Sequence, residues 1–184
     1  MKKIVIVLTL LALAFVLPAR EKKIFASIGV SAFQSADAGF KDLYGGPQVC
    51  PELKVGYNLY RHFYFWLGGS FISASGIIPV VEDEAKVSQA FISLGAGWET
   101  RRWHRLQADV CAALLMAGLN EKAMGATVSK WVPGFDVRAG LRYFLKENLF
   151  LGLNLGYAGA RAEVKEKDIK LGGLRLGGSL GLRF

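Results

Sequence analysis

Six charged residues could form either a layer of ion pairs or a conducting constriction inside the protein. They lie on the polar side of segments in which apolar and polar residues alternate, and counting from nearby turns places them at similar depth. A buried charge costs several kcal/mol unless it is paired, so three acids and three bases at one level predict mutual ion pairing. The six are Glu52, Lys54, Asp109, Asp136, Arg138 and Arg175.

The sequence offers two candidates for a catalytic base, His62 and His104. Hydrolysis or acyl transfer would need a nucleophile beside the base, but no serine is paired with either histidine and no G-x-S-x-G motif occurs. Glu82, Asp83 and Glu84 could bind a divalent cation through their oxygens. A solvated acidic loop explains these three acids better. We therefore expect no enzyme activity, no metal site and no cofactor.

Residues 1–19 have the pattern of a cleavable signal peptide. Lys2 and Lys3 precede an apolar run over 4–16, and Leu17-Pro18-Ala19 supplies a cleavage sequence, with Ala12-Leu13-Ala14 as a shorter alternative. The run is shorter than the roughly 20 residues that a membrane-spanning helix needs. The expected organisation is a signal peptide over 1–19 and one domain over 20–184. The formal charge of +8 is scattered among acids, which argues against nucleic acid as a partner.

Export would favour a disulfide between Cys50 and Cys111, because secreted proteins form disulfides readily. The two residues fall on segments three apart in the expected sheet, farther than the roughly 7 Å between Cα atoms that a disulfide tolerates. We expect two unpaired thiols in the interior.

Eight segments show the period of two that is typical of β-strands. Short connections alternate with longer ones at 35–46, 74–86, 119–130 and 161–168, as in outer-membrane barrels. Residues 106–117 also fit helical spacing, but removing them leaves an odd number of strands. The expected strands are 23–34, 47–60, 63–73, 87–98, 103–118, 131–144, 149–160 and 169–184.

Alternation alone does not say which face of these strands lies outside. In 149–160, Leu149, Leu151, Leu153 and Leu155 share one face, which a soluble lipocalin-like barrel would turn inward. Three features favour lipid on the apolar face: small residues on the polar face, a last strand that ends on an aromatic residue of the apolar face without a polar tail, and aromatic residues near the short turns. In lipid every backbone group must be paired, so the strands must close into a barrel. The aromatic residues are Tyr60, Phe63, Trp98, Trp103, Tyr143, Phe150 and Phe184.

The signal peptide, the eight amphipathic segments and the terminal Gly-Leu-Arg-Phe together resemble the small outer-membrane β-barrels of the OmpA/OmpX kind. The resemblance implies an all-β, eight-stranded, antiparallel up-and-down transmembrane barrel. It also implies that Leu180, Leu182 and Phe184 form the signal read by the barrel-assembly machinery, with Ser179 where glycine is often found. Barrels that modify lipid A share this architecture, but this chain has no histidine near the outer leaflet for such an activity.

The expected function is structural or interactive, in the outer membrane of a Gram-negative-type cell with both termini periplasmic. The four long loops would be the contact surface, and the partners would be outer-membrane lipid, lipopolysaccharide and the assembly machinery. One alternative is a narrow pore for small solutes, although eight strands leave little more than side-chain room inside. A second is a secreted soluble barrel that binds an apolar ligand.

Overall fold

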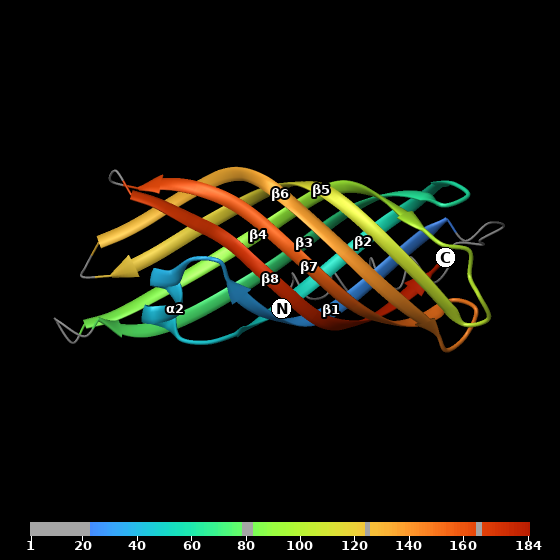
Figure 1. Cartoon of the computed structure of the whole chain (residues 1–184), viewed down its shortest axis with the longest axis horizontal. Coiled ribbons are helices and arrows are strands. Elements are labelled where there is room, and N and C mark those ends of the chain that lie inside the picture. The colour runs from blue at the N-terminus through green and yellow to red at the C-terminus, as the bar shows by residue number, and fades with distance from the viewer. Residues whose placement is uncertain (1–22, 79–82, 124–125, 165–166) are drawn as a thin grey trace, which may run out of the picture.

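The computed structural model describes residues 23–78, 83–123, 126–164 and 167–184, so the expected signal peptide lies outside the described residues. The eight strands form one closed antiparallel sheet in sequence order, which confirms the expected fold class (Figure 1). The ambiguous segment 106–117 is a strand, as expected. The strands are β1 (Ile24–Ser35), β2 (Gln48–Tyr60), β3 (Phe63–Ile78), β4 (Asp83–Glu99), β5 (Leu106–Ala123), β6 (Ala126–Phe144), β7 (Leu149–Val164) and β8 (Lys167–Arg183).

The register of the strands defines the shape of the barrel. Following paired residues once around the sheet from Ile24 leads back to β1 at Gln34, a shear of ten residues. With eight strands this shear corresponds to a tilt of roughly 35–45° and an interior just wide enough for side chains. The path passes Tyr57, Phe65, Ala96, Ala112, Val137, Tyr157 and Leu174.

The apolar faces of the strands point outward. Leu151, Leu153 and Leu155 are 45%, 59% and 49% exposed, whereas the alternating Phe150 is 2% exposed. Large apolar side chains are exposed on every strand around the sheet, whereas the interior holds polar, aromatic and some aliphatic side chains. A soluble lipocalin-like barrel would require the opposite orientation, so this geometry argues against that alternative. No helix among the described residues is long and apolar enough to cross a membrane.

The interior is filled in layers, because small residues on one strand admit large rings from another. A Cβ atom added at Gly56 would overlap the ring of Phe25, and one added at Gly97 would overlap the ring of Tyr64. These rings form a cluster with Trp66 near the end of the barrel that carries the short turns, hereafter the short-turn end. A second apolar cluster fills the opposite half, and its large members are Phe33, Phe40, Tyr44, Ile72, Phe91, Leu115, Leu119 and Leu171.

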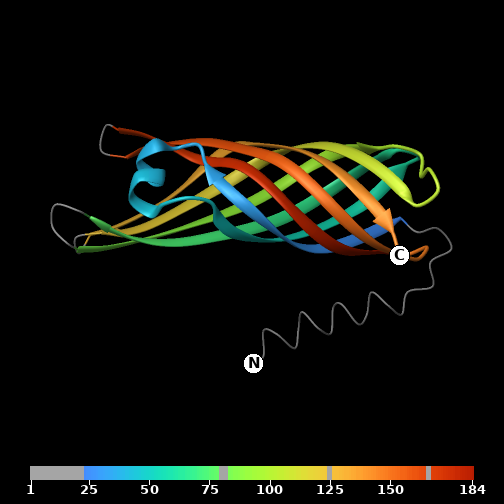
Figure 2. The same cartoon turned by 60° about the horizontal axis from the view of Figure 1, so that its bottom comes forward.

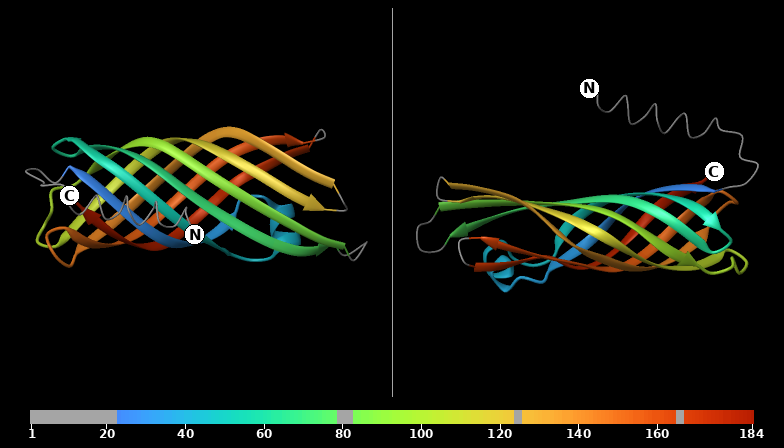
Figure 3. Two further views of the ribbon diagram at one scale, coloured as in Figure 1. Left: turned by 180° about the vertical axis from the view of Figure 1, so that it is seen from behind. Right: turned by 90° about the horizontal axis from the view of Figure 1, so that it is seen from above.

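Three of the four expected long loops are wrong, because strand pairing continues through most of them. The hairpins β3–β4, β5–β6 and β7–β8 extend to the pairs Ile78↔Asp83, Ala123↔Ala126 and Val164↔Lys167. The hairpins project at one end, hereafter the hairpin end (Figure 3). Above an apolar band the outward face needs no apolar residues, so the period of two fades from the sequence while backbone hydrogen bonds continue.

The fourth connection contains a short helix that the sequence reading missed, α2 (Ala38–Tyr44). Asp37 caps it by accepting a hydrogen bond from the Phe40 amide at 3.0 Å, as aspartate commonly does at a helix N-terminus. The helix lies at the hairpin end, and the C-terminus lies at the short-turn end (Figure 2). One turn expected to be tight is longer than expected, since β4 ends at Glu99 and β5 begins at Leu106.

Candidate functional site

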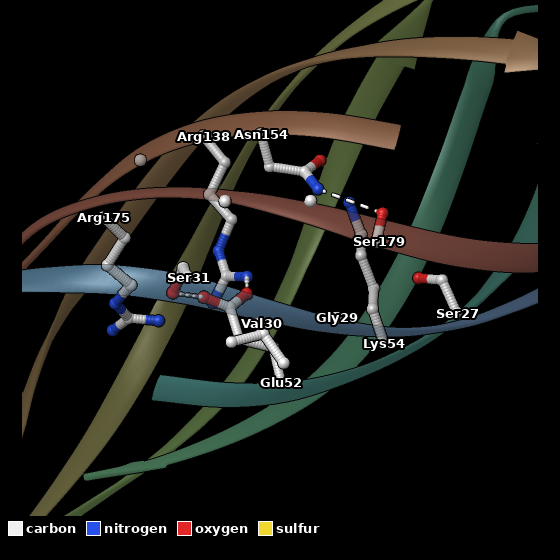
Figure 4. Close-up of a pocket in the computed structure, with 13 residues that line it drawn as sticks. Ser27, Gly29, Val30, Ser31, Glu52, Lys54, Arg138, Asn154, Arg175 and Ser179 are labelled. Carbon is white, nitrogen blue, oxygen red and sulfur yellow. Dashed lines mark hydrogen bonds and ion pairs between the residues drawn. The ribbon is translucent and has the colours of Figure 1, made fainter. Parts of the chain in front are cut away.

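Arg138 lies at the centre of a first group of lumen charges. It donates through Nη1 to Glu52 Oε2 at 2.6 Å and through Nη2 to Asp136 Oδ2 at 2.7 Å. Figure 4 shows Arg138 and Glu52 approaching each other across the lumen, from β6 and β2 on opposite sides of the sheet. Arg175 of β8 places Nη1 3.8 Å from Asp136 Oδ2 and 3.1 Å from the Ser70 hydroxyl. This group therefore connects three strands through charged side chains.

Hydroxyl groups complete the hydrogen bonding of these carboxylates. Ser31 donates to Glu52 Oε1 at 2.6 Å, and Ser93 donates to Asp136 Oδ2 at 2.8 Å. The two acids and two bases balance in formal charge, which is the condition for keeping ions in a poorly solvated interior. We call Glu52, Asp136, Arg138 and Arg175 the mid-lumen group.

A second group of charges lies nearer the short-turn end. Asp109 is 3.8 Å from Lys54 Nζ and 3.2 Å from Arg142 Nη2. Glu99 Oε2 accepts from Arg142 Nη1 at 2.9 Å and from Arg183 Nη2 at 2.7 Å. These five residues, the short-turn group, link β2, β4, β5, β6 and β8 across the lumen.

The structure divides the six sequence-predicted charges between the two groups instead of placing them in one layer. Glu52 and Lys54 both face inward, but they are two residues apart along β2 and therefore differ in height. The Trp66 ring lies between the two levels, with its centroid 4.8 Å from Lys54 Nζ and 5.1 Å from Arg138 Cζ. The expectation of a single level is therefore wrong.

Three members of the short-turn group were missed from the sequence. Alternation along their strands places Arg142 on the same face as Arg138, and Arg183 on the same face as Arg175. That periodicity could have identified both arginines. Glu99 is the last residue of β4, where the sequence reading placed a turn, so its inward position had no periodic support.

Little empty space is left between the two charged groups. A cavity of about 30 Å³ is lined in part by Glu52, Lys54, Arg138 and Asn154 (Figure 4). A water molecule needs at least about 10–15 Å³ of such volume, so this space admits about two waters. Toward the hairpin end the lumen is filled by buried apolar side chains such as Phe33 and Phe91. The arrangement can hold the strands together, but it leaves no wide aqueous path among the described residues.

The helix α2 contributes Phe40 and Tyr44 to the apolar cluster at the hairpin end of the lumen. The Tyr44 hydroxyl donates to Glu121 Oε1 at 2.8 Å, which ties α2 to β5. Burial and the nearby Glu121 carboxylate raise the pKa of Tyr44 above its ordinary value, so this phenol stays protonated and able to donate. A cavity of about 170 Å³ lies beside the helix, lined by Phe40, Val87, Leu119 and other residues.

The three residues of the expected assembly signal lie on the closing strand and at its end. Leu180 is exposed on the outer wall, and Leu182 and Phe184 are partly exposed. The Phe184 amide donates to the Ile24 carbonyl at 2.7 Å, and the Ile24 amide donates back at 3.1 Å, so these residues help close the barrel. Their recognition by assembly machinery stays a prediction.

The other candidate residues of the sequence are two cysteines, two histidines and three adjacent acids. Cys50 and Cys111 are both free and buried. His62 and His104 lie in connections at the short-turn end, as expected. Within residues 23–78, 83–123, 126–164 and 167–184, no three His, Cys, Asp or Glu side chains cluster as metal ligands. Of the three adjacent acids, Glu82 lies outside the described residues.

The sequence matches no protein-family model and no curated protein. Solved structures do match the fold. Neisserial surface protein A (NspA) is 12% identical, and the alignment covers 88% of this chain and 97% of NspA with a TM-score of 0.67. OprG from Pseudomonas aeruginosa is 11% identical, over 88% of this chain and 96% of OprG, with a TM-score of 0.68. Ail, the attachment invasion locus protein of Yersinia pestis, is 17% identical, over 88% and 98%, with a TM-score of 0.55.

At these identities the likeness concerns the fold alone. It agrees with the closed sheet topology of this chain. The chain has the fold of the small eight-stranded outer-membrane β-barrels.

Proposed function

We propose that the protein is an outer-membrane barrel with a structural or interactive role. The observation that carries this proposal is the combination of an apolar outer wall with a lumen filled by paired charges and buried rings. Lipid satisfies the outer wall, and the closed sheet satisfies the backbone. The filled lumen supports a plug over the alternative of a solute pore, because conduction requires a continuous polar path.

The proposed orientation places the short-turn end and both termini in the periplasm. Outer-membrane barrels have short periplasmic turns and longer extracellular segments, and here the long segments are α2 and three extended hairpins. These elements form the proposed contact surface outside the cell. One solved structure of this fold is named for attachment and invasion, so the fold supports an interactive role in at least one other protein.

The orientation can be tested with an epitope tag inserted into full-length protein in a Gram-negative host. A tag after Gly46, which is exposed between α2 and β2, is expected to bind antibody on intact cells. A matched tag after Glu147, in the β6–β7 turn, is expected to bind antibody only after the outer membrane is permeabilised. The reverse pattern would contradict the proposed orientation. If antibody detects neither tag in the isolated membrane fraction, the proposed location in the outer membrane is wrong.

A further inference from the structure

The barrel wall opens between β6 and β7 toward the hairpin end. Pairing of these strands ends at Gly134↔Ala160, whereas β5–β6 pairing continues to Ala123↔Ala126 and β7–β8 pairing to Val164↔Lys167. The two hairpins separate beyond this point in two views (Figures 2 and 3). Pro133, the residue directly before Gly134, lies on the hairpin-end side of this last pair. It has no backbone N–H to continue the ladder.

A groove of about 760 Å³ occupies this opening. Its outer part is lined by side chains of the lipid-facing wall, including Pro133, Phe135 and Tyr157. Ala160 and Leu171 also line it, although both are buried on the inward side of their strands. The groove therefore extends from the outer wall into the thickness of the barrel. Its volume lies in the range of roughly 300–1,000 Å³ that is usual for sites of small organic ligands.

Two basic side chains border the groove. Arg161 of β7 and Lys170 of β8 are direct cross-strand partners, and both are exposed. No ion pair joins either side chain to a carboxylate among the described residues whose side chains are placed. The nearby Asp37 carboxylate accepts hydrogen bonds from backbone amides, those of Phe40 and Lys170.

The basic pair lies where the apolar outer wall ends. Along β7 the outward residues change from Leu153, Leu155 and Tyr157 through Gly159 to Arg161. The partner strand makes the same change over the same rungs, from Leu174 to Lys170. A lipid whose chain lies in the groove would therefore have its headgroup at the level of these two cations.

We propose that this groove binds an acyl chain of a phosphorylated glycolipid of the lipid A class, with a phosphate held by Arg161 and Lys170. The guanidinium group matches phosphate geometry through paired hydrogen bonds, and the ammonium adds a second positive charge. The choice of lipid A rests on the proposed function, because that orientation places the hairpin end in the outer leaflet. The groove and the basic pair do not depend on the orientation.

The test uses the purified barrel in detergent and native mass spectrometry with diphosphorylated lipid A as the probe. The wild-type protein is expected to retain one lipid A molecule. The double variant Arg161→Gln/Lys170→Gln is expected to weaken this binding on the order of tenfold, as loss of two charge-assisted contacts predicts. The matched control, Arg101→Gln/Lys146→Gln, removes two exposed cations from the short-turn end and is expected to bind like wild type.

A second variant tests the groove itself. Gly159→Leu places a large side chain in the groove on the outward face, where its Cβ atom would lie 2.9 Å from the Phe135 ring and displace the end of that ring. The variant is expected to lose lipid A binding although it keeps Arg161 and Lys170. Urea unfolding checks that the variant is still folded. Equal binding by wild type, the double variant and Gly159→Leu would overturn the site.

The lipid source is tested in the same instrument. Fully dephosphorylated lipid A is expected to bind weakly and without distinction between wild type and the Arg161→Gln/Lys170→Gln variant. If the wild-type protein retains phosphatidylglycerol to the same extent as lipid A, the assignment to lipid A is wrong. A reversed epitope pattern combined with phosphate-dependent lipid A binding would contradict the proposed orientation and leave the groove intact, so the two failures can be distinguished.

Discussion

Replacing Arg138 by methionine is expected to lower the free energy of unfolding by about 3–5 kcal/mol, the cost typical of breaking a buried ion pair. The methionine keeps much of the volume but removes the charge that faces both Glu52 and Asp136. Asp136 would retain Arg175 at 3.8 Å, and Glu52 would retain only the Ser31 hydroxyl among the partners identified. Urea unfolding of the protein folded in lipid vesicles measures the loss.

A second change separates charge imbalance from loss of packing. In Arg138→Met/Glu52→Gln the mid-lumen group is again formally neutral, so we expect more than half of the lost stability to return. The exposed Arg101, in the β4–β5 connection, supplies the control: Arg101→Met is expected to change stability by less than about 0.5 kcal/mol. Wild-type stability of Arg138→Met would show that the ion pairs do not support the fold.

Replacing Leu155 by arginine is expected to destabilise the folded, lipid-embedded barrel by about 2–4 kcal/mol, the cost of a basic residue on the lipid face near the bilayer midplane. Leu155 points outward, and its registered partners Ala139 and Leu176 are apolar and also exposed. The physical cause is transfer of the guanidinium into hydrocarbon, which no lumen contact relieves. Reversible folding into vesicles over a denaturant series measures this effect.

An outward leucine at a different depth in the membrane supplies the control for the Leu155 substitution. Leu59 also points outward but lies at the short-turn end of β2, so Leu59→Arg is expected to cost only about 0–1 kcal/mol. A soluble barrel would place both leucines in water, where the two substitutions would have similar small effects. Equal effects of the two arginines would therefore argue against lipid around the wall.

The membrane-facing part of the fold could be predicted because lipid imposes a strict alternation on it. In β7, every second residue from Leu149 to Tyr157 is large and apolar, and the expected strand 149–160 begins where the observed one does. The same constraint resolved residues 106–117, whose helical spacing was equally good, because a closed sheet needs the strand. The orientation of the faces followed from small residues such as Gly97, which the ring of Tyr64 requires.

Beyond the apolar band lipid no longer imposes this alternation, and the expected strand ends were wrong there. Pairs such as Lys122↔Thr127 continue a hairpin without any apolar alternation, so polarity was taken for a loop. The helix α2 is only seven residues long, and its burial depends on contacts with distant strands. The inward position of Glu99 was missed for a similar reason, because it depends on three distant partners from β2, β6 and β8 that bind its carboxylate.

The lumen explains how a chain with many charges can have an apolar exterior. Charged side chains of both groups are turned inward, and each acid meets at least one base there. Rings such as Trp66 pack between the cations and replace water around their faces. The interior thus serves as the core of the protein, and the interactions that we propose are assigned to its wall and its hairpin end.

The central claim is that this lumen is a sealed core and not a conduit, and planar-bilayer recording tests it most directly. The purified protein is inserted from detergent into a lipid bilayer in molar potassium chloride. We expect no stepwise current above the baseline, although urea unfolding of the same preparation shows that the protein is folded. Arg138→Met is expected to remain silent despite its lower stability. Reproducible conductance steps in the wild-type protein, enlarged in Arg138→Met, would contradict the account.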